Sequence, residues 1–435
     1  MPALRPAHRS SLLFILGLCL AAAFAVLSDG ARHHAARADA ASLAPNAATL
    51  PLTAPRALTP EDRAAARRAW RYFDTQTRSQ TGLVDSVAGF PSTTLWDQGS
   101  YLLALVSARR LGLLPESEFA QRIQSLLTSL EDLPLFEGKL PNKVYDTRSL
   151  VMVDYDNTPQ PEGIGWSALD MGRMLMALRV LESAEPKLSP RIRALLASWD
   201  LTAMTKNGEL WGAIREDGVT RLRQEGRLGY EQYAARAATL WGLDVIPAAS
   251  VRRVLDWREV QGIEVPVDTR RASAFRAITP ILSEPFLLQA LELGLDSETR
   301  LLAEAVYRAQ EARYHATGHL TAVSEDHLDR PPHFLYATVF SNGRPWAVVD
   351  EDGGFHPALR SQSVKASFGW DALYDTDYTG RLRDKIHTIG APERGWPAGI
   401  YEADGGVNAA YTLNTNAVVL EAVHYMAYGP LWSLQ

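Results

Sequence analysis

The pattern of hydrophobic and polar positions predicts two alternating kinds of helix along most of the chain. Segments such as residues 100–108 and 171–178 are apolar on every side, which is typical of helices surrounded by protein. Segments such as residues 116–130, 189–199 and 297–314 carry polar residues on one side, as helices with one solvated face do. The alternation predicts inner helices paired with outer ones.

Short loops containing Trp, Gly or acidic residues lead into small and apolar helices six times. These loops begin at Thr94, Gly165, Gly229, Ser283, Phe368 and Asn414. The repetition predicts an all-α fold, an (α/α)6 toroid of six helical hairpins whose inner helices converge. Residues 131–165, 202–229 and 315–367 show few helical signals, so we expect long irregular loops there, at the end of the toroid that holds the cleft.

The chain divides into three predicted parts. Arg5 and Arg9 precede an apolar run from Leu12 through Leu27, which predicts a signal peptide or an N-terminal signal anchor over residues 1–28. Residues 29–58 are rich in Ala and Pro and read as a flexible linker. The toroid occupies residues 59–435, with Thr59 as the cap of its first helix. We therefore expect a periplasmic or extracellular protein, with or without a tether to the inner membrane.

Composition narrows the chemistry. The only cysteine, Cys19, lies in the apolar run, so residues 29–435 contain no disulfide, thiolate ligand or cysteine nucleophile. Acidic residues outnumber basic ones by 50 to 44 without a long basic stripe, which argues against a nucleic-acid partner. No dinucleotide, phosphate-loop or zinc motif is present, so we expect no cofactor and no metal. A polysaccharide or oligosaccharide is the expected partner.

Glu231 is the first candidate for a catalytic acid. It stands in the first turn of a predicted helix among aromatic and small residues. A carboxyl group desolvated against aromatic rings has a raised pKa, as a general acid requires. The competing interpretation is a glutamate that stabilises the helix dipole.

Further carboxylates are candidates for the second catalytic role. Asp170 lies in an otherwise apolar helix, where a charge needs either a partner, such as Arg173, or a function. Asp156 and Glu162 belong to an acidic loop just before that helix, and a solvated loop is the alternative for both.

Aromatic residues at helix entries are candidates for stacking on sugar rings, with core packing as the alternative for each. These residues and their polar neighbours make up the predicted substrate-binding set: Trp96, Asp97, Trp166, Arg173, Tyr230, Tyr233, Trp370 and Asp371.

Three motifs in this order resemble a known family. Leu95-Trp96-Asp97, the segment from Gly165 to Arg173 and the segment from Glu225 to Ala235 look like the bacterial domain of unknown function numbered 3131, over residues 60–430. More distantly, they are similar to six-hairpin, glucoamylase-like hydrolases that include endo-β-1,2-glucanases. That resemblance implies that Glu231 is a critical glutamate and that Ser167 to Asp170 match a Ser-x-x-Asp helix.

The combined prediction is an exported glycoside hydrolase acting on a bacterial β-glucan, with β-1,2-glucan as the first substrate to test. Glu231 would be the general acid, and Asp170 or a carboxylate of the 154–162 loop would position the water. One alternative is a polysaccharide lyase on the same fold, using Tyr233 with Arg236 or a loop histidine. The other is a non-catalytic, membrane-tethered protein that binds or assembles glycans.

Overall fold

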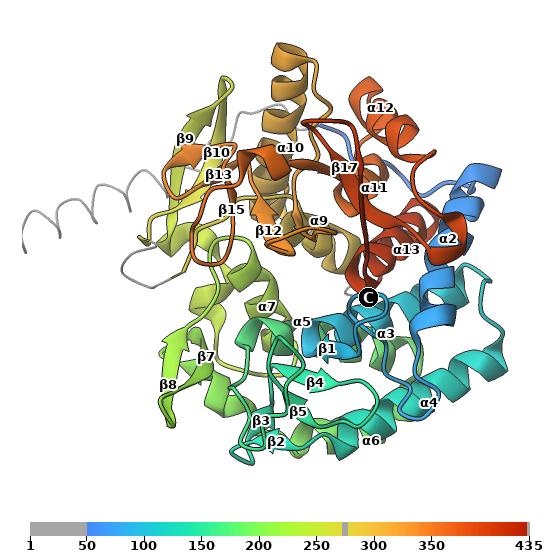
Figure 1. Cartoon of the computed structure of the whole chain (residues 1–435), viewed down its shortest axis with the longest axis vertical. Coiled ribbons are helices and arrows are strands. Elements are labelled where there is room, and N and C mark those ends of the chain that lie inside the picture. The colour runs from blue at the N-terminus through green and yellow to red at the C-terminus, as the bar shows by residue number, and fades with distance from the viewer. Residues whose placement is uncertain (1–49, 272–276, 433–435) are drawn as a thin grey trace, which may run out of the picture. The chain divides into compact units, whose positions relative to one another are not determined.

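Six inner helices form a closed ring in the computed structural model, which describes residues 50–271 and 277–432. They are α3 (Leu95–Arg110), α5 (Ala168–Ala184), α7 (Tyr230–Thr239), α9 (Glu284–Leu288), α11 (Val364–Leu373) and α13 (Leu413–Tyr428). Each packs against the next in chain order, and α13 packs against α3 (Figure 1). A π-helical turn, Gln289–Leu293, extends α9. The predicted helical toroid is therefore present.

Outer helices pair with these inner ones. They are α2 (Pro60–Gln76), α4 (Glu116–Asp132), α6 (Ser189–Ala197), α10 (Ser297–Thr317) and α12 (Asp377–Ile386). After α7 the outer position is taken by two short 3-10 helices, η3 (Ile246–Ala249) and η4 (Val251–Arg253). Thr59 caps α2 as expected. Its side chain accepts a hydrogen bond from the Asp62 amide, and the Asp62 side chain accepts one from the Thr59 amide.

The all-α part of the prediction holds only in part, because small antiparallel sheets fill the loops between helices. The longer strands pair as β7 (Glu209–Glu216) with β8 (Val219–Gln224), and as β9 (Leu255–Val260) with β10 (Ile263–Asp268). The regions predicted as irregular hold β2 to β5 (residues 135–153), β6 to β8 (205–224) and β11 to β16 (325–363). Two more strands, β17 (Pro397–Tyr401) and β18 (Val407–Tyr411), precede α13.

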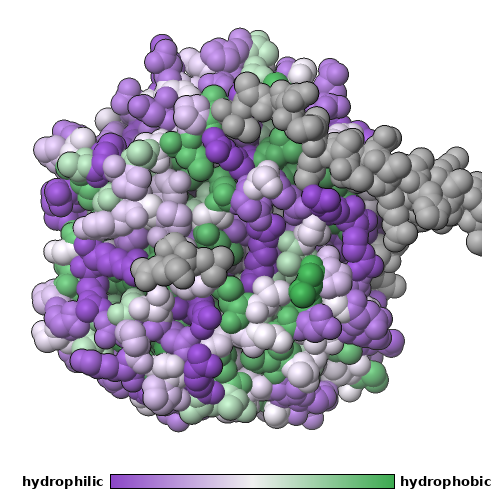
Figure 2. Space-filling view, turned by 180° about the vertical axis from the view of Figure 1, so that it is seen from behind, coloured by the Kyte–Doolittle hydropathy of each residue, from purple (hydrophilic) through white to green (hydrophobic). Residues whose placement is uncertain are grey.

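Close helix packing requires glycine at one place in the ring. A Cβ atom on Gly172 of α5 would lie 2.4 Å from the Cβ atom of Ala234 on α7. No side chain fits in that gap, so glycine lets the two inner helices approach. On the face seen in Figure 2, hydrophobic residues lie in small groups among hydrophilic ones.

Of the segments predicted at the N-terminus, only residues 50–58 lie in the part of the chain that the structure describes. The expected signal or anchor and residues 29–49 lie outside the described residues. Residues 50–58 are irregular but fixed, because the Thr53 and Arg56 amides donate to the Leu373 and Met426 carbonyls at 2.9 and 2.8 Å. Residues 50–58 are therefore not part of a flexible linker, which corrects that end of the prediction. Within residues 50–271 and 277–432, no helix has the length and apolar character needed to cross a membrane.

Candidate active site

A polar side chain lies in the first turn of every inner helix. These residues are Asp97, Asp170, Glu231, Glu284, Lys365 and Asn414. We call the end of the ring that they define the ring mouth. Local capping fixes two of them, because the side chains of Thr94 and Ser167 accept hydrogen bonds from the amides of Asp97 and Asp170.

Two carboxylates share one hydroxyl at the start of α5. Ser167 Oγ lies 3.0 Å from Asp170 Oδ1 and 2.8 Å from Glu225 Oε1. Glu225 also accepts the backbone amide of Ala168. A hydroxyl can donate only one hydrogen, so both carboxyl groups can be hydrogen-bonded to Ser167 at once only if one of them, Asp170, carries a proton. Burial, and then the charge of Glu225, raise the pKa of Asp170 to about 7.

Glycines bring Glu225 and α5 together. A Cβ atom on Gly212 of β7 would lie 2.3 Å from Glu225 Oε2. Gly165, with φ of +128°, places its Cα so close to β7 that a Cβ atom would lie 2.0 Å from the Ala213 carbonyl oxygen. Glycine at both positions therefore allows the β7–β8 hairpin to carry Glu225 to the start of α5.

An ion-paired group occupies the other side of the ring mouth. Lys365 pairs with Glu284, and Asn414 Nδ2 donates to Glu284 Oε1 at 2.6 Å. Asp97 accepts from the hydroxyls of Ser86 and Thr94. Burial raises the pKa of Asp97, whereas Lys365 opposes the rise. Asp97 is thus part of this network.

The strand β11 (Glu325–His327) brings two more acids to Lys365. Asp326 is buried, with Oδ1 3.8 Å from Lys365 Nζ, and burial raises its pKa to about 7. Glu325 is partly exposed, and burial of the carboxyl group and then the nearby Glu284 raise its pKa. Tyr336 on β12 (Phe334–Ala337) faces Glu325 in register.

The hydroxyl of Tyr336 is influenced by acids from several of these elements. Burial and then the charges of Glu325, Glu351, Tyr155 and Asp170 raise the pKa of its hydroxyl. The acids of α5 and of β11 therefore act on one phenol, although they are far apart in the sequence.

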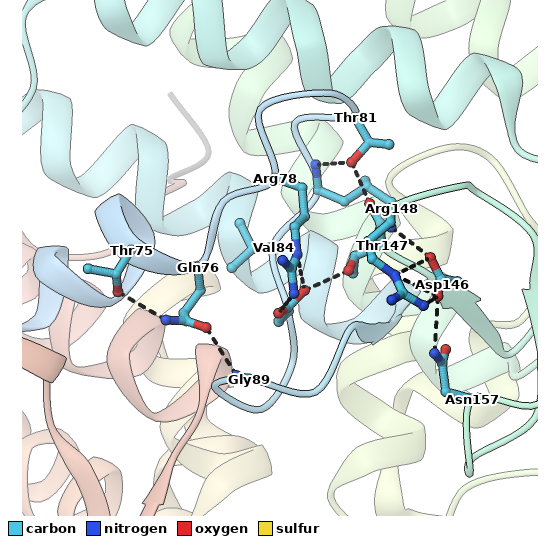
Figure 3. A network of polar contacts seen from close by, with 12 residues as sticks. Thr75, Gln76, Arg78, Thr81, Val84, Gly89, Asp146, Thr147, Arg148 and Asn157 are labelled. Carbon is cyan, nitrogen blue, oxygen red and sulfur yellow. Dashed lines mark hydrogen bonds and ion pairs between the residues drawn. The ribbon is translucent and has the colours of Figure 1, made fainter.

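Tyr155 offers an accessible aromatic ring near the same acids. The residue is 63% exposed, yet burial of its hydroxyl by the surrounding protein, and then the charge of Asp170, raise the pKa of that hydroxyl. Figure 3 shows what holds its loop: Asn157 Nδ2 donates to Asp146 Oδ2 at 3.0 Å, and Arg148 pairs with the same carboxylate.

Glu231 has a different environment from the one expected for a proton donor. Its side chain is almost fully buried, and Oε2 lies 2.7 Å from Arg270 Nη2. Gln224 Nε2 donates to its other oxygen at 2.8 Å. Burial raises the pKa of Glu231, while Arg270 opposes the rise. Arg270 also pairs with Asp268, so these contacts form a structural ion-pair network.

Arg173 and Tyr233 lie one turn deeper than the ring mouth, which corrects their assignment to substrate binding. Arg173 is fully buried and pairs with Glu292 and Glu421. It donates to the Tyr233 hydroxyl at 2.9 Å, and that hydroxyl donates to Glu292 at 2.7 Å. The guanidinium group also lies 5.4 Å from the ring of Trp96. A substrate cannot reach groups packed in this way.

Several other predicted site residues serve the core or the surface. Trp166 is 2% exposed, and its Nε1 donates to the Trp211 carbonyl. Trp370 was expected at a helix entry, but α11 begins at Val364, so Trp370 lies in its second half and donates to Ser283 Oγ. Asp371 pairs with Arg383 of α12.

The acidic loop does not supply a buried base. Asp156 is exposed, and Glu162 is exposed and pairs with Arg215. Two aromatic candidates do lie at the ring mouth: Trp96 is partly exposed, and its ring centroid is 5.7 Å from that of Tyr230, which is 7% exposed.

In residues 50–271 and 277–432, no three His, Cys, Asp or Glu side chains are placed to hold one metal ion. A surface cavity of about 430 Å³ lies between α2 and the turn after α3, lined by Arg63, Arg67, Trp70 and Leu111 among others. It is at the opposite end of α3 from Asp97.

The family match covers most of the folded chain. The model described as "Protein of unknown function (DUF3131)" matches residues 64–429. The chain belongs to the DUF3131 family. No curated protein matches it in sequence.

Solved structures resemble this DUF3131 chain in fold. An endo-β-1,2-glucanase from Chitinophaga pinensis, complexed with sophorotriose and glucose, has a TM-score of 0.61 at 13% identity, covering 86% of this chain and 94% of that one. A candidate glucoamylase from Bacteroides caccae has a TM-score of 0.62 at 12% identity, with the same coverages. An endo-β-1,2-glucanase from Talaromyces funiculosus with sophorose has a TM-score of 0.55 at 16% identity, covering 83% of each chain.

Sequence reasoning missed several polar groups of this DUF3131 site: Tyr155, Glu225, Glu284, Glu325, Asp326, Tyr336, Glu351 and Lys365. Glu225 stands in the same motif as Glu231, and Glu284 follows the fourth helix entry, so a signal was available for both. Glu325 and Tyr336 come from a hairpin in a region read as irregular, which left no signal for their pairing.

Proposed function

We propose that this protein is a glycoside hydrolase acting on a β-glucan. The observation that carries the proposal is the Asp170–Ser167–Glu225 arrangement at the ring mouth, partly exposed and close to aromatic side chains. Hydrolysis of a glycosidic bond needs two carboxyl groups with different protonation, and environments that shift their pKa values supply that difference.

Asp170 is the proposed base. A carboxylate with a pKa near 7 accepts a proton from water more readily than an ordinary carboxylate does, and it is still ionised in useful amount near neutral pH. Glu225, fixed by Ser167 and by the Ala168 amide, holds the negative charge that raises this pKa.

The proposed substrate is β-1,2-glucan, supported by fold similarity to endo-β-1,2-glucanases and therefore by analogy. The acidic ring mouth also favours an uncharged chain over a uronate. The lyase alternative has less support, because Tyr233 is buried against Arg173 and Arg236 pairs with Asp296. Export directed by residues 1–28, acting as a signal peptide or as a signal anchor, is also part of the proposal.

Reducing-sugar release from β-1,2-, β-1,3-, β-1,4- and α-linked glucans by purified residues 41–435 tests the function. We expect product from the β-1,2-linked glucan with wild type and a loss of about 10²–10⁴-fold in Asp170→Asn. Glu162→Gln is the control, since Glu162 is an exposed ion-pair partner. Product from none of the glucans would contradict the proposed function.

A further inference from the structure

Glu325 lies between two residues that contact the ring mouth. Ser324 Oγ donates to Glu284 Oε2 at 3.3 Å. Asp326 Oδ1 lies 3.8 Å from Lys365 Nζ. Glu325 itself lies on β11, directly opposite Tyr336 of β12 in the antiparallel register. The hydroxyl of Tyr230, at the start of α7, lies beside its carboxyl group. Both Glu325 and Tyr336 are partly exposed, so a bound molecule can touch them.

The groups around Glu325 favour its neutral form. Glu284 and Asp326 are acidic neighbours, and both are almost completely buried. Lys365 is the neighbouring cation, but it is already paired with Glu284. Burial and the charge of Glu284 outweigh Lys365, so the pKa of Glu325 is raised.

Glu231 is less suited to donate a proton to a bound molecule. Its two oxygens are taken by Arg270 and Gln224, and its exposed fraction is 2%. Burial raises its pKa as well, but Arg270 opposes that rise because a guanidinium group favours the charged carboxylate. Lys365, and not an arginine, is the cation among the principal charges that act on Glu325, and Glu325 is more exposed than Glu231.

We propose that Glu325 is the proton donor of the hydrolysis, an assignment that rests on the proposed function. As the bond between the anomeric carbon and the glycosidic oxygen breaks, the proton of Glu325 moves to that oxygen, which leaves as a sugar hydroxyl. One water molecule adds to the anomeric carbon and gives its proton to Asp170. Solvent then returns the proton from Asp170 to Glu325, so each cycle consumes one water and one glycosidic bond.

Tyr336 lies directly opposite Glu325 in the antiparallel register of β11 and β12. The charges of Glu325 and of Asp170 both raise the pKa of its hydroxyl.

The experiment compares two substrates in Glu325→Gln. One is the glucan that wild type hydrolyses, and the other is the dinitrophenyl glycoside of the oligosaccharide it releases, whose leaving group needs no proton. We expect kcat on the glucan to fall about 10²–10⁴-fold. Glu325→Gln should cleave the aryl glycoside at a rate within about 10-fold of wild type. The pH–rate profile of the variant should lack the fall in rate at high pH that deprotonation of the acid causes. Glu264→Gln, an exposed strand glutamate on β10, is the matched control and should behave as wild type.

Three results would overturn the assignment. Glucan hydrolysis by Glu325→Gln at nearly the wild-type rate would exclude an acid role. An equal loss on both substrates would indicate a role in binding or folding. A loss on the glucan with retained aryl activity in Glu231→Gln instead would move the proton donor to Glu231. Each result requires active wild type, so it is distinguishable from failure of the proposed function.

Discussion

Asp170 and Glu225 compete for one hydrogen, that of the Ser167 hydroxyl, which lies 3.0 and 2.8 Å from their nearest oxygens. Glu225 has a second donor in the Ala168 amide, whereas the carboxyl group of Asp170 has only the shared hydroxyl within the described part of the chain. Asp170 is therefore the member of the pair that takes up a proton near neutral pH.

Ser167→Ala should move the acidic limb of the pH–rate profile to higher pH. The Ser167 hydroxyl lowers the pKa of Asp170, so its loss leaves burial and Glu225 to raise that pKa further. The change also removes the cap of α5, at a cost of about 1 kcal/mol in the free energy of unfolding. The measurement is kcat/KM on the glucan across the neutral range.

Thr412→Ala is the control for that experiment. Thr412 caps α13 in the same way, through the amide of Thr415, but has no contact with Asp170 among the described residues. It should lower stability by a similar amount and leave the acidic limb unchanged. A limb that stays in place in Ser167→Ala would show that Asp170 is not the group that titrates.

The sequence predicts the ring better than the loops, for physical reasons. Apolar helices and capping residues act locally, so α3, α5 and α7 were expected where they lie. The hairpins have equally local signals, since Asn207-Gly208 and Asp217-Gly218 both have positive φ. These turns join β6 to β7 and β7 to β8, yet the region was read as irregular.

Site roles were harder to predict because they depend on partners distant in sequence. Glu231 was an attractive acid from its aromatic neighbours, but Arg270 lies beside it only in the folded chain. Arg173 was expected to face a ligand, and Glu292 and Glu421 instead enclose it. Asp170 lies at the start of α5 as expected, because its helix cap, Ser167, is local. Its catalytic role stays a prediction.

Arg173→Met should destabilise the ring far more than Glu421→Gln. Removing the guanidinium group leaves Glu292 buried without its cation, which costs about 3–5 kcal/mol. Burial and Glu292 raise the pKa of Glu421, which favours its neutral form, so glutamine should change the unfolding free energy by less than about 1 kcal/mol. Urea unfolding of both variants measures this, and equal losses would contradict a neutral Glu421.

Tyr155→Ala should raise KM for the glucan about 2- to 10-fold and leave kcat nearly unchanged, because an exposed ring stacks on a sugar without touching the reacting atoms. Asn157→Ala, which releases the loop from Asp146, should act in the same direction and more weakly. Tyr428→Ala is the control, since Tyr428 is 57% exposed at the end of α13, away from the ring mouth. An unchanged KM in Tyr155→Ala would remove this residue from the site.

Asp170→Asn should raise stability at alkaline pH while it abolishes activity. The pKa of Asp170 is about 7 in the folded chain and 3.8 without these neighbours. Between those values the folded state binds more protons than the unfolded state, so stability falls as the pH rises and stays low above pH 7. Asparagine is neutral at every pH and avoids this loss. Thermal unfolding at pH 8 should therefore show a higher Tm for Asp170→Asn than for wild type, and at pH 4 the difference should vanish. A lower Tm for the variant at pH 8 would mean that the charged form of Asp170 stabilises the fold, which would contradict its proposed role as a base held ready near pH 7.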